Sequence, residues 1–330
     1  MLSFISLEDH FASEAIRSSP NVDRFGFDLF PIKVQEDMYD LSDRRIRDMD
    51  KGNVSLQVVS SIPALEPLEI CRETNDQLAG AVKKSEGRLA GFAMLPMADA
   101  QAAADELERC VKNLGFLGAL IPNHAGGQYY DADAYRLFWK RAQDLDVPIY
   151  LHPTPPTPKM RLNYEGNYPP QVTSIFSQQG WGWHSDVALH VIRLYASGLF
   201  NPGVCPRLKL VIGHMGEMLP FMIRRINTRL NANWKPQERT LLTIWAENIW
   251  ITISGMWDLA PFACLIRSTS IDRILYSVDW PFESTEDGRN FMEAVEKSGL
   301  VNKRELEMIA YRNAEELLKV KATWANQGSL

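Results

Sequence analysis

Short apolar runs recur along the chain between amphipathic stretches. They are rich in β-branched residues and show little alternation between apolar and polar positions, which is typical of strands buried on both faces of a parallel sheet. The pattern predicts eight strands, at Phe4–Leu7, Leu56–Ile62, Leu89–Leu95, Phe116–Ile121, Val147–Leu151, Leu208–Ile212, Ile249–Ile253 and Arg273–Val278.

Most stretches between these runs carry apolar residues at helical spacing. The clearest predicted helices are Asp99–Leu114, Ala132–Leu145, Val187–Leu199 and Lys303–Leu318. Eight strands that alternate with helices predict an α/β fold, a closed (β/α)₈ TIM barrel that forms one domain over residues 1–330.

Two stretches interrupt this alternation. Residues Ser18–Asp37 and Thr154–Gly182 are rich in Pro, Gly, Asn or aromatic side chains. We expect both to be loop insertions over the mouth of the barrel, the second one directly after the fifth strand.

Composition narrows the class of protein. The apolar fraction of 45% and the charged fraction of 23% are ordinary for a soluble globular chain. A net charge of -6 argues against nucleic acid as a partner, which requires a basic face. No run of about 18 apolar residues is present to span a membrane, and Met1–Leu7 lacks the features of a signal peptide.

The cysteines indicate a reducing, intracellular compartment. The chain has four, Cys71, Cys110, Cys205 and Cys264, and no C-x-x-C pair, so a zinc ribbon or a thioredoxin-like site is not expected. We interpret them as reduced, mostly buried thiols, which is the usual state in the cytoplasm.

Three of the six histidines directly follow predicted strands. These are His10 in LEDH, His152 in YLHP and His214 in VIGHMGE; Asp279 follows the eighth strand in YSVDWPFE. Active sites of (β/α)₈ barrels lie at the carboxyl ends of the strands. The four residues therefore predict an active site built from four different strands.

Glu8 and His10 are two residues apart, which places both side chains on one face of an extended strand. Together with His152 and Asp279 they supply two imidazoles and two carboxylates, a set that suits Zn²⁺, Mn²⁺ or Fe²⁺ with an open position. Each residue alone has a simpler interpretation, such as Asp279 capping the next helix. Their shared position at strand ends favours the metal centre.

The same segments carry a family resemblance. LEDHFA, YLHP, LKLVIGHMGE and RILYSVDWPFE resemble the amidohydrolase superfamily over nearly the whole chain. They are most similar to the branch that holds aminocarboxymuconate-semialdehyde decarboxylase and the γ-resorcylate and 2,3-dihydroxybenzoate decarboxylases. The long GHMGE and SVDWPFE blocks are the specific part of this likeness.

The resemblance implies roles for individual residues. Glu8, His10, His152 and Asp279 would hold one divalent metal ion per chain, Zn²⁺ or Mn²⁺, with no organic cofactor. Asp279 would also donate a proton, and His214 would act beside it, paired with Glu217. The branch further implies a homodimer or a homotetramer.

Substrate contacts are implied for four more residues. Arg225 in FMIRRI matches the arginine that follows the GHMGE block in γ-resorcylate decarboxylases. Asn123 stands one position away from an asparagine that contacts substrate in those enzymes, and His184 in WGWHSD replaces small residues. With Trp183, these are our candidates for binding the substrate.

Together, these features predict metal-dependent, non-oxidative decarboxylation of an ortho-hydroxybenzoate-type acid, such as 2,6- or 2,3-dihydroxybenzoate. The reaction would release CO₂ and a phenol, and it would be reversible. Two alternatives stay open: a hydrolase of lactones or amides on the same fold, and an inactive barrel that serves as a scaffold. The intact ligand set argues against the second.

Overall fold

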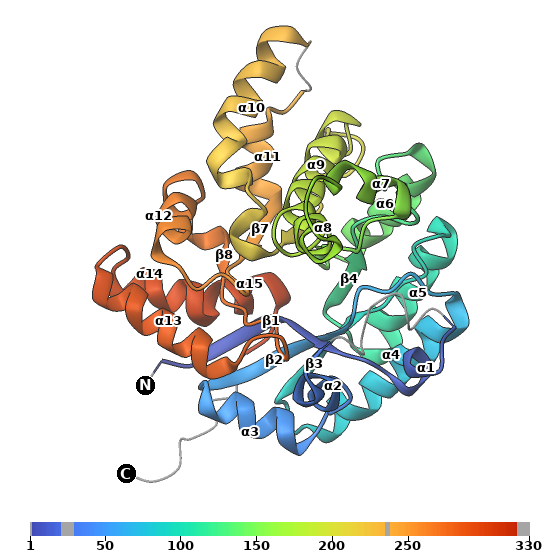
Figure 1. Cartoon of the computed structure of the whole chain (residues 1–330), viewed down its shortest axis with the longest axis vertical. Helices are drawn as coiled ribbons and strands as arrows, with labels where there is room; N and C mark the ends of the chain where they lie inside the picture. The colour runs from blue at the N-terminus through green and yellow to red at the C-terminus, as the bar shows by residue number, and fades with distance from the viewer. Residues whose placement is uncertain (1, 21–29, 235–237, 322–330) are drawn as a thin grey trace.

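The computed structural model describes residues 2–20, 30–234 and 238–321. Eight parallel strands follow one another in chain order around a single sheet (Figure 1). They are β1 (Phe4–Phe11), β2 (Val54–Ser61), β3 (Leu89–Ala93), β4 (Gly118–Pro122), β5 (Ile149–His152), β6 (Leu210–Ile212), β7 (Ile249–Thr252) and β8 (Ile274–Leu275). The predicted barrel is confirmed.

The barrel closes between the end of β8 and β1. The Asp279 amide donates to the Glu8 carbonyl at 2.8 Å, and the His10 amide donates to the Trp280 carbonyl at 2.6 Å. Between these bonds and β8, the Ser277 hydroxyl accepts from the Glu8 amide at 2.7 Å. Because side-chain hydroxyls replace part of the ladder, β8 is shorter than the predicted Arg273–Val278.

Helices connect the strands around the outside of the barrel (Figure 1). They are α1 (Glu14–Arg17), α2 (Ile32–Met38), α3 (Asp43–Lys51), α4 (Leu68–Lys84), α5 (Ala100–Leu114), α6 (Arg136–Asp144), α7 (Pro158–Arg161), α8 (Pro170–Ser177), α9 (Gly182–Ala196), α10 (Leu219–Asn233), α11 (Leu241–Asn248), α12 (Leu259–Ser268), α13 (Thr285–Ser298), α14 (Lys303–Glu307) and α15 (Asn313–Leu318).

Helix α5 shows how local sequence sets these elements. The Asp99 side chain accepts hydrogen bonds from the amides of Gln101 and Ala102, which starts the helix. The helix ends at Gly115, which has a φ of 73° and closes the last turn. The prediction of a helix at Asp99–Leu114 is confirmed, with Asp99 as its cap.

The predicted helix at Lys303–Leu318 contains a π-helical turn at Met308–Arg312, between α14 and α15. The carbonyl of Ile309 accepts a hydrogen bond from the Tyr276 amide at 2.9 Å. This hydrogen bond to the end of β8 competes with the regular hydrogen bonds inside the helix, which accounts for the wider turn.

Helix α9 begins at Gly182, five residues before the predicted start at Val187, so it includes Trp183 and His184. The segment before it, predicted as an insertion, contains α7 and α8, and its residues Ser174 and Gln178 line the pocket at the barrel mouth. The other insertion, Ser18–Asp37, lies partly outside the described residues.

Side chains alternate between the two faces of the strands. Ile149 and Leu151 on β5 face the surrounding helices, whereas Tyr150 packs in an inner cluster with Ile5, Leu7 and other residues of the barrel interior. His152 continues the inward series of Tyr150. Strand alternation therefore aims the residues at the ends of the strands into the barrel.

Two features of the described residues bear on the predictions about membrane spans and cysteines. Within the described part of the chain, no helix combines the length and apolar character that crossing a membrane requires. The cysteines are free; Cys71, Cys110 and Cys205 are buried and Cys264 is partly exposed.

Candidate metal centre

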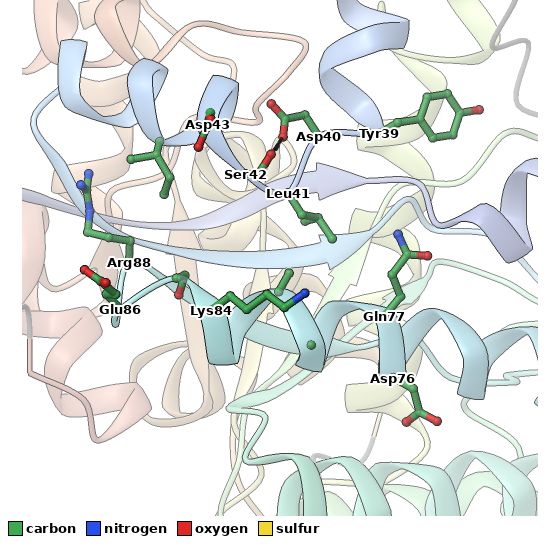
Figure 2. A pocket seen from close by; sticks show the side chains of 14 residues that line it. Tyr39, Asp40, Leu41, Ser42, Asp43, Asp76, Gln77, Lys84, Glu86 and Arg88 are labelled. Carbon is green, nitrogen blue, oxygen red and sulfur yellow. Dashed lines mark hydrogen bonds between the residues drawn. The ribbon is translucent and has the colours of Figure 1, made fainter.

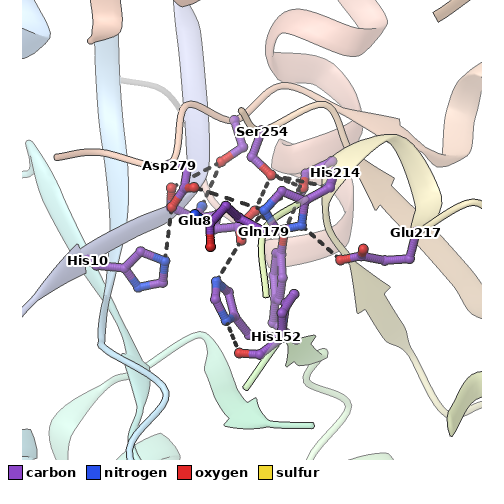
Figure 3. A network of polar contacts seen from close by, with 12 residues as sticks. Glu8, His10, His152, Gln179, His214, Glu217, Ser254 and Asp279 are labelled. Atoms are coloured by element: carbon purple, nitrogen blue, oxygen red, sulfur yellow. Dashed lines mark hydrogen bonds and ion pairs between the residues drawn. The ribbon is translucent and has the colours of Figure 1, made fainter. Parts of the chain in front are cut away.

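The four predicted ligands converge at the carboxyl ends of their strands. Glu8 and His10 lie within β1, His152 ends β5 and Asp279 follows β8. One ligand atom from each lies within 4.8 Å of the others (Figure 3). The strand β1 extends to Phe11, so Glu8 and His10 belong to the strand itself rather than following it.

These buried ligand atoms lack hydrogen-bond partners. No described residue forms a hydrogen bond with Glu8 Oε1, His10 Nε2 or Asp279 Oδ1. Leaving buried polar atoms unpaired costs about 1–3 kcal/mol each. A cation among them would remove that cost, and two carboxylates with two imidazoles suit a divalent metal. The residues present therefore fit the expected ion.

The histidine tautomers agree with this. His152 Nδ1 lies 2.7 Å from the Pro153 carbonyl, so it carries the proton and leaves the lone pair on Nε2. That lone pair faces Glu8 Oε1 at 3.0 Å. A carboxylate oxygen and an imidazole lone pair repel each other unless a positive charge lies between them.

Burial and mutual repulsion perturb the titration of the cluster. Burial, together with the charge of Glu8, raises the pKa of Asp279 well above its usual range. Burial lowers the pKa of His10 to about 4. For Glu8, burial acts to raise the pKa, but His214, His152 and His10 together hold it well below its usual range. His10 is therefore neutral, as a metal ligand must be.

Residues that the sequence did not single out orient Glu8. Its Oε2 accepts short hydrogen bonds from the hydroxyls of Tyr150 and Ser254. Gly213 permits this approach, because a Cβ there would lie 2.9 Å from the Tyr150 hydroxyl and 3.1 Å from Glu8 Oε2. The one available signal was the Tyr150-x-His152 spacing, which places both side chains on one strand face.

His214 lies beside the ligands rather than among them. Its Nε2 is 3.8 Å from Glu8 Oε1 and 3.9 Å from Asp279 Oδ2. Its Nδ1 faces Glu217 Oε1 at 2.8 Å, as the sequence predicted. His214 and Glu217 both have positive φ, 49° and 53°, in the sharp turn after β6. Such conformations in non-glycine residues cluster at functional sites.

A third residue completes this group. His184 Nδ1 lies 2.6 Å from Glu217 Oε2, so the buried carboxylate bridges two imidazoles. Burial acts to lower the pKa of His214, but Glu217 and Glu8 raise it to about 10. Burial acts to raise the pKa of Glu217, but the two histidines lower it to about 2. The carboxylate is thus ionised and His214 is protonated.

A pocket of about 610 Å³ opens onto the cluster. No lysine or arginine is among the described residues that line it, and the wall opposite the cluster is largely apolar. The lining is His10, Phe30, Ile62, Pro63, His152, Pro153, Pro155, Ser174, Gln178, Gln179, Trp183, His184, His214, Gly255, Met256, Asp279, Phe282 and Glu283.

Of the four candidates for substrate contact, the structure brings two to this pocket. Trp183 and His184 line it, and no described residue accepts from the buried Trp183 indole N–H. Asn123 is buried outside the lining, where its amide bonds Asp186 and His190. Arg225 is exposed on α10, which extends away from the barrel (Figure 1). Neither Asn123 nor Arg225 is among the described residues that line this pocket.

The simpler interpretation of Asp279 as a helix cap is wrong. Helix α13 begins at Thr285, and the side chain that caps it is that of Ser284. Asp279 has a φ of 77° and points to the ligand cluster. Its conformation serves the pocket rather than the helix.

A larger hollow of about 860 Å³ lies on the outside of the barrel between α3 and α4 (Figure 2). Its lining mixes acidic and basic side chains, among them Asp76, Lys84 and Arg88. It includes none of the predicted site residues, so its size does not make it the active site.

Comparison with known proteins shows the family of this chain. The family model described as amidohydrolase matches residues 65–320 of the chain. The chain belongs to the amidohydrolase family. A curated relative, the decarboxylase orsB of Emericella nidulans, is 47% identical over 324 residues, which cover 96% of this chain and 97% of the relative.

Two solved structures of this family are similar over nearly their whole length. A 2,6-dihydroxybenzoate decarboxylase in complex with 2,6-dihydroxybenzoate has a TM-score of 0.85 at 33% identity, covering 97% of this chain and 100% of that one. A dihydroxybenzoic acid decarboxylase from Polaromonas sp., with bound manganese and the inhibitor 2-nitroresorcinol, has a TM-score of 0.85 at 35% identity, with 97% of each chain covered. The resemblance seen in the sequence is confirmed, and it favours the decarboxylase over the hydrolase.

Proposed function

We propose that this chain is a metal-dependent, non-oxidative decarboxylase of ortho-hydroxybenzoate-type acids, of which 2,6- and 2,3-dihydroxybenzoate are examples. The observation that carries the proposal is the cluster of unpaired ligand atoms, from Glu8, His10 and Asp279, at the floor of an enclosed pocket. The decarboxylases that share the fold and a third or more of the sequence support the reaction class.

Glu8, His10, His152 and Asp279 would hold one divalent ion, Zn²⁺ or Mn²⁺, and the Polaromonas structure contains manganese. When bound, the ion would supply positive charge to the carboxylate and the adjacent phenolate oxygen of the substrate. The reaction needs no organic cofactor, because it releases CO₂ without a net change of oxidation state.

The chain's own residues supply the proton. Decarboxylation of an aromatic acid requires a proton on the ring carbon that bears the carboxylate; this breaks aromaticity, and cleavage of the C–C bond restores it as CO₂ leaves. Asp279 lines the pocket, and its Oδ2 lies 3.9 Å from His214 Nε2. We assign the proton donor to Asp279.

His214 would stabilise this centre. It is protonated, it faces both Glu8 and Asp279, and Glu217 holds its ring. Its charge favours the ionised form of the carboxylates around it and of an anionic substrate. Trp183, Phe282 and Met256 line the same pocket and offer apolar surface to the ring of the substrate.

The test is a panel of hydroxybenzoates with metal-loaded protein. We expect turnover of acids with a hydroxyl ortho to the carboxylate, and carboxylation of the phenol product in excess bicarbonate. The 3- and 4-hydroxy isomers are the matched controls, since they differ only in hydroxyl position. Equal turnover of 4-hydroxybenzoate would refute the ortho-hydroxyl requirement.

The proposal extends to the whole chain. Ligands come from positions 8 to 279, so we propose one catalytic domain over residues 1–330. Free, mostly buried thiols support a cytoplasmic enzyme.

We also propose a homodimer or a homotetramer. Large apolar side chains are exposed on neighbouring helices, including Phe176 on α8, Leu189 on α9 and Phe221 on α10, which is 82% exposed. Exposed apolar side chains that gather on one part of a surface are typical of protein interfaces. Sedimentation of the purified chain tests this, and a monomer at micromolar concentration would exclude it.

A further inference from the structure

His184 lies between two hydrogen-bond acceptors. Its Nδ1 is 2.6 Å from Glu217 Oε2, and its Nε2 is 3.0 Å from the backbone carbonyl of Gln179. A carbonyl oxygen and a carboxylate oxygen can only accept, and a neutral imidazole has only one N–H. The shorter contact, to the carboxylate of Glu217, is the one to which the Nδ1–H of His184 donates.

Buried hydrogen bonds hold α9, the helix that carries His184, against the barrel. Two other residues of α9, Asp186 and His190, bond the buried side chain of Asn123 at the end of β4, at 2.6 and 3.1 Å. These contacts set the height and rotation of the helix against the barrel. They place His184 at the mouth, where its ring packs edge-on against His214 with the centroids 5.2 Å apart.

Both ring nitrogens of His184 are occupied by protein groups, so neither is available to a substrate. Its effect must pass through Glu217. The buried carboxylate accepts from His184 on one oxygen and from His214 on the other. Through Gln179, the same ring also connects this pair to the segment that lines the pocket mouth.

We propose that His184 is a positioning residue: through its hydrogen bond it fixes Glu217 and so holds His214 in place, and it ties the Gln178–Gln179 segment over the pocket. This rests on the proposed decarboxylase function for its kinetic consequences, but not for the hydrogen bond to Glu217. The earlier expectation of direct substrate contact predicts a different kinetic result.

The kinetic test compares His184→Phe with His184→Gln in metal-loaded enzyme. Phe fills the space without donors, so kcat should fall about 10–100-fold, the usual cost of losing a partner that orients a catalytic group. Gln keeps one donor toward Glu217 and should recover part of kcat. Because the substrate does not touch the ring nitrogens, KM should change little, by less than about threefold.

Lys297→Ala is the control, since Lys297 is exposed on α13 and does not line the pocket, and it should leave kcat unchanged. Metal content and thermal unfolding of each variant confirm that the site has formed. A rise in KM at unchanged kcat would overturn the proposal in favour of direct contact, and full kcat in the Phe variant would overturn any role through Glu217.

A spectroscopic measurement is independent of activity. The chain has six histidines, so ¹⁵N spectra of histidine-labelled, zinc-loaded protein are tractable, and His184→Gln identifies the resonances that belong to residue 184. We expect Nδ1 of residue 184 to carry a proton that is hydrogen-bonded to Glu217. An Nδ1 without a proton would overturn the proposal, even if the enzyme acts on another substrate.

Discussion

Two polar clusters lie at the mouth of the barrel, and they differ in how their atoms are paired. The metal cluster, Glu8, His10, His152 and Asp279, leaves buried oxygen and nitrogen atoms without hydrogen-bond partners among the described residues. The anchor cluster joins side chains at the end of β4 to α9, and its members are Asn123, Tyr129, Asp186 and His190.

In the anchor cluster both ring nitrogens of His190 have hydrogen-bond partners. Its Nδ1 donates to Asn123 Oδ1 at 3.1 Å, and its Nε2 accepts from the Tyr130 amide at 3.0 Å. Buried polar groups that serve only the fold are paired in this way. The contrast indicates that unpaired atoms of ligand type that converge on one point mark the place of an ion, whereas histidine and carboxylate content alone does not. Four predictions test that distinction.

The largest effect should follow metal removal. Dialysis against a chelator should abolish decarboxylation, because the substrate would lose the ion that orients its carboxylate and phenolate oxygens, and added Mn²⁺ or Zn²⁺ should restore it. Thermal unfolding should also respond, since an ion at 100 times its Kd stabilises a fold by about 2.7 kcal/mol. Full activity in protein shown by elemental analysis to be metal-free would contradict the assignment.

Asp279→Asn should lose activity by at least about 10²–10⁴-fold, the usual contribution of a general acid. Asn keeps an oxygen for weak coordination, but its amide cannot deliver a proton at neutral pH. The measurement is turnover per bound metal, with thermal unfolding as the control for folding. Near-normal turnover per metal would shift the donor role to His214.

Asn123→Ala should behave in the opposite way. It would leave Asp186 Oδ2 and the His190 N–H without their partner, which should cost about 1–3 kcal/mol in the free energy of unfolding. Turnover of the folded, metal-loaded protein should fall less than in His184→Phe, because His184 keeps its own contacts with Glu217 and Gln179. If instead KM rises sharply while stability is kept, Asn123 binds substrate and the distinction between the clusters fails.

The smallest effect concerns the pH dependence of stability. Burial lowers the pKa of His190 from 6.5 to about 3. Below pH 6.5 the unfolded chain binds a proton that the folded chain does not, so this contribution to stability is present above 6.5 and is lost as the pH falls.

At pH 5.5, one unit below the unfolded value, the loss should be about 1.4 kcal/mol. Denaturant unfolding of the wild type and of His190→Gln between pH 7.5 and pH 5.5 isolates this group, because other titrating residues contribute to both proteins. Parallel pH profiles for the two proteins would show that His190 does not titrate as its buried position requires.

The contribution of the sequence is clearest in the metal cluster. Strand periodicity and position after a strand are local properties, and together they placed Glu8, His10, His152 and Asp279 at one end of a barrel, where the structure has them. The pairing of His214 with Glu217 was implied by the family resemblance, and the structure has the two residues in contact within one turn.

Only tertiary structure decided which other side chains meet. Tyr150 bonds Glu8 across 142 positions, and His184 bonds Glu217 across 33, and neither pair has a local pattern. Asn123 and Arg225 have residue types suited to binding an acid, yet packing against α9 uses the first and the outward course of α10 exposes the second. Backbone periodicity is written in neighbouring residues, whereas a side chain's partner depends on how whole elements pack, and that is set only when the barrel closes.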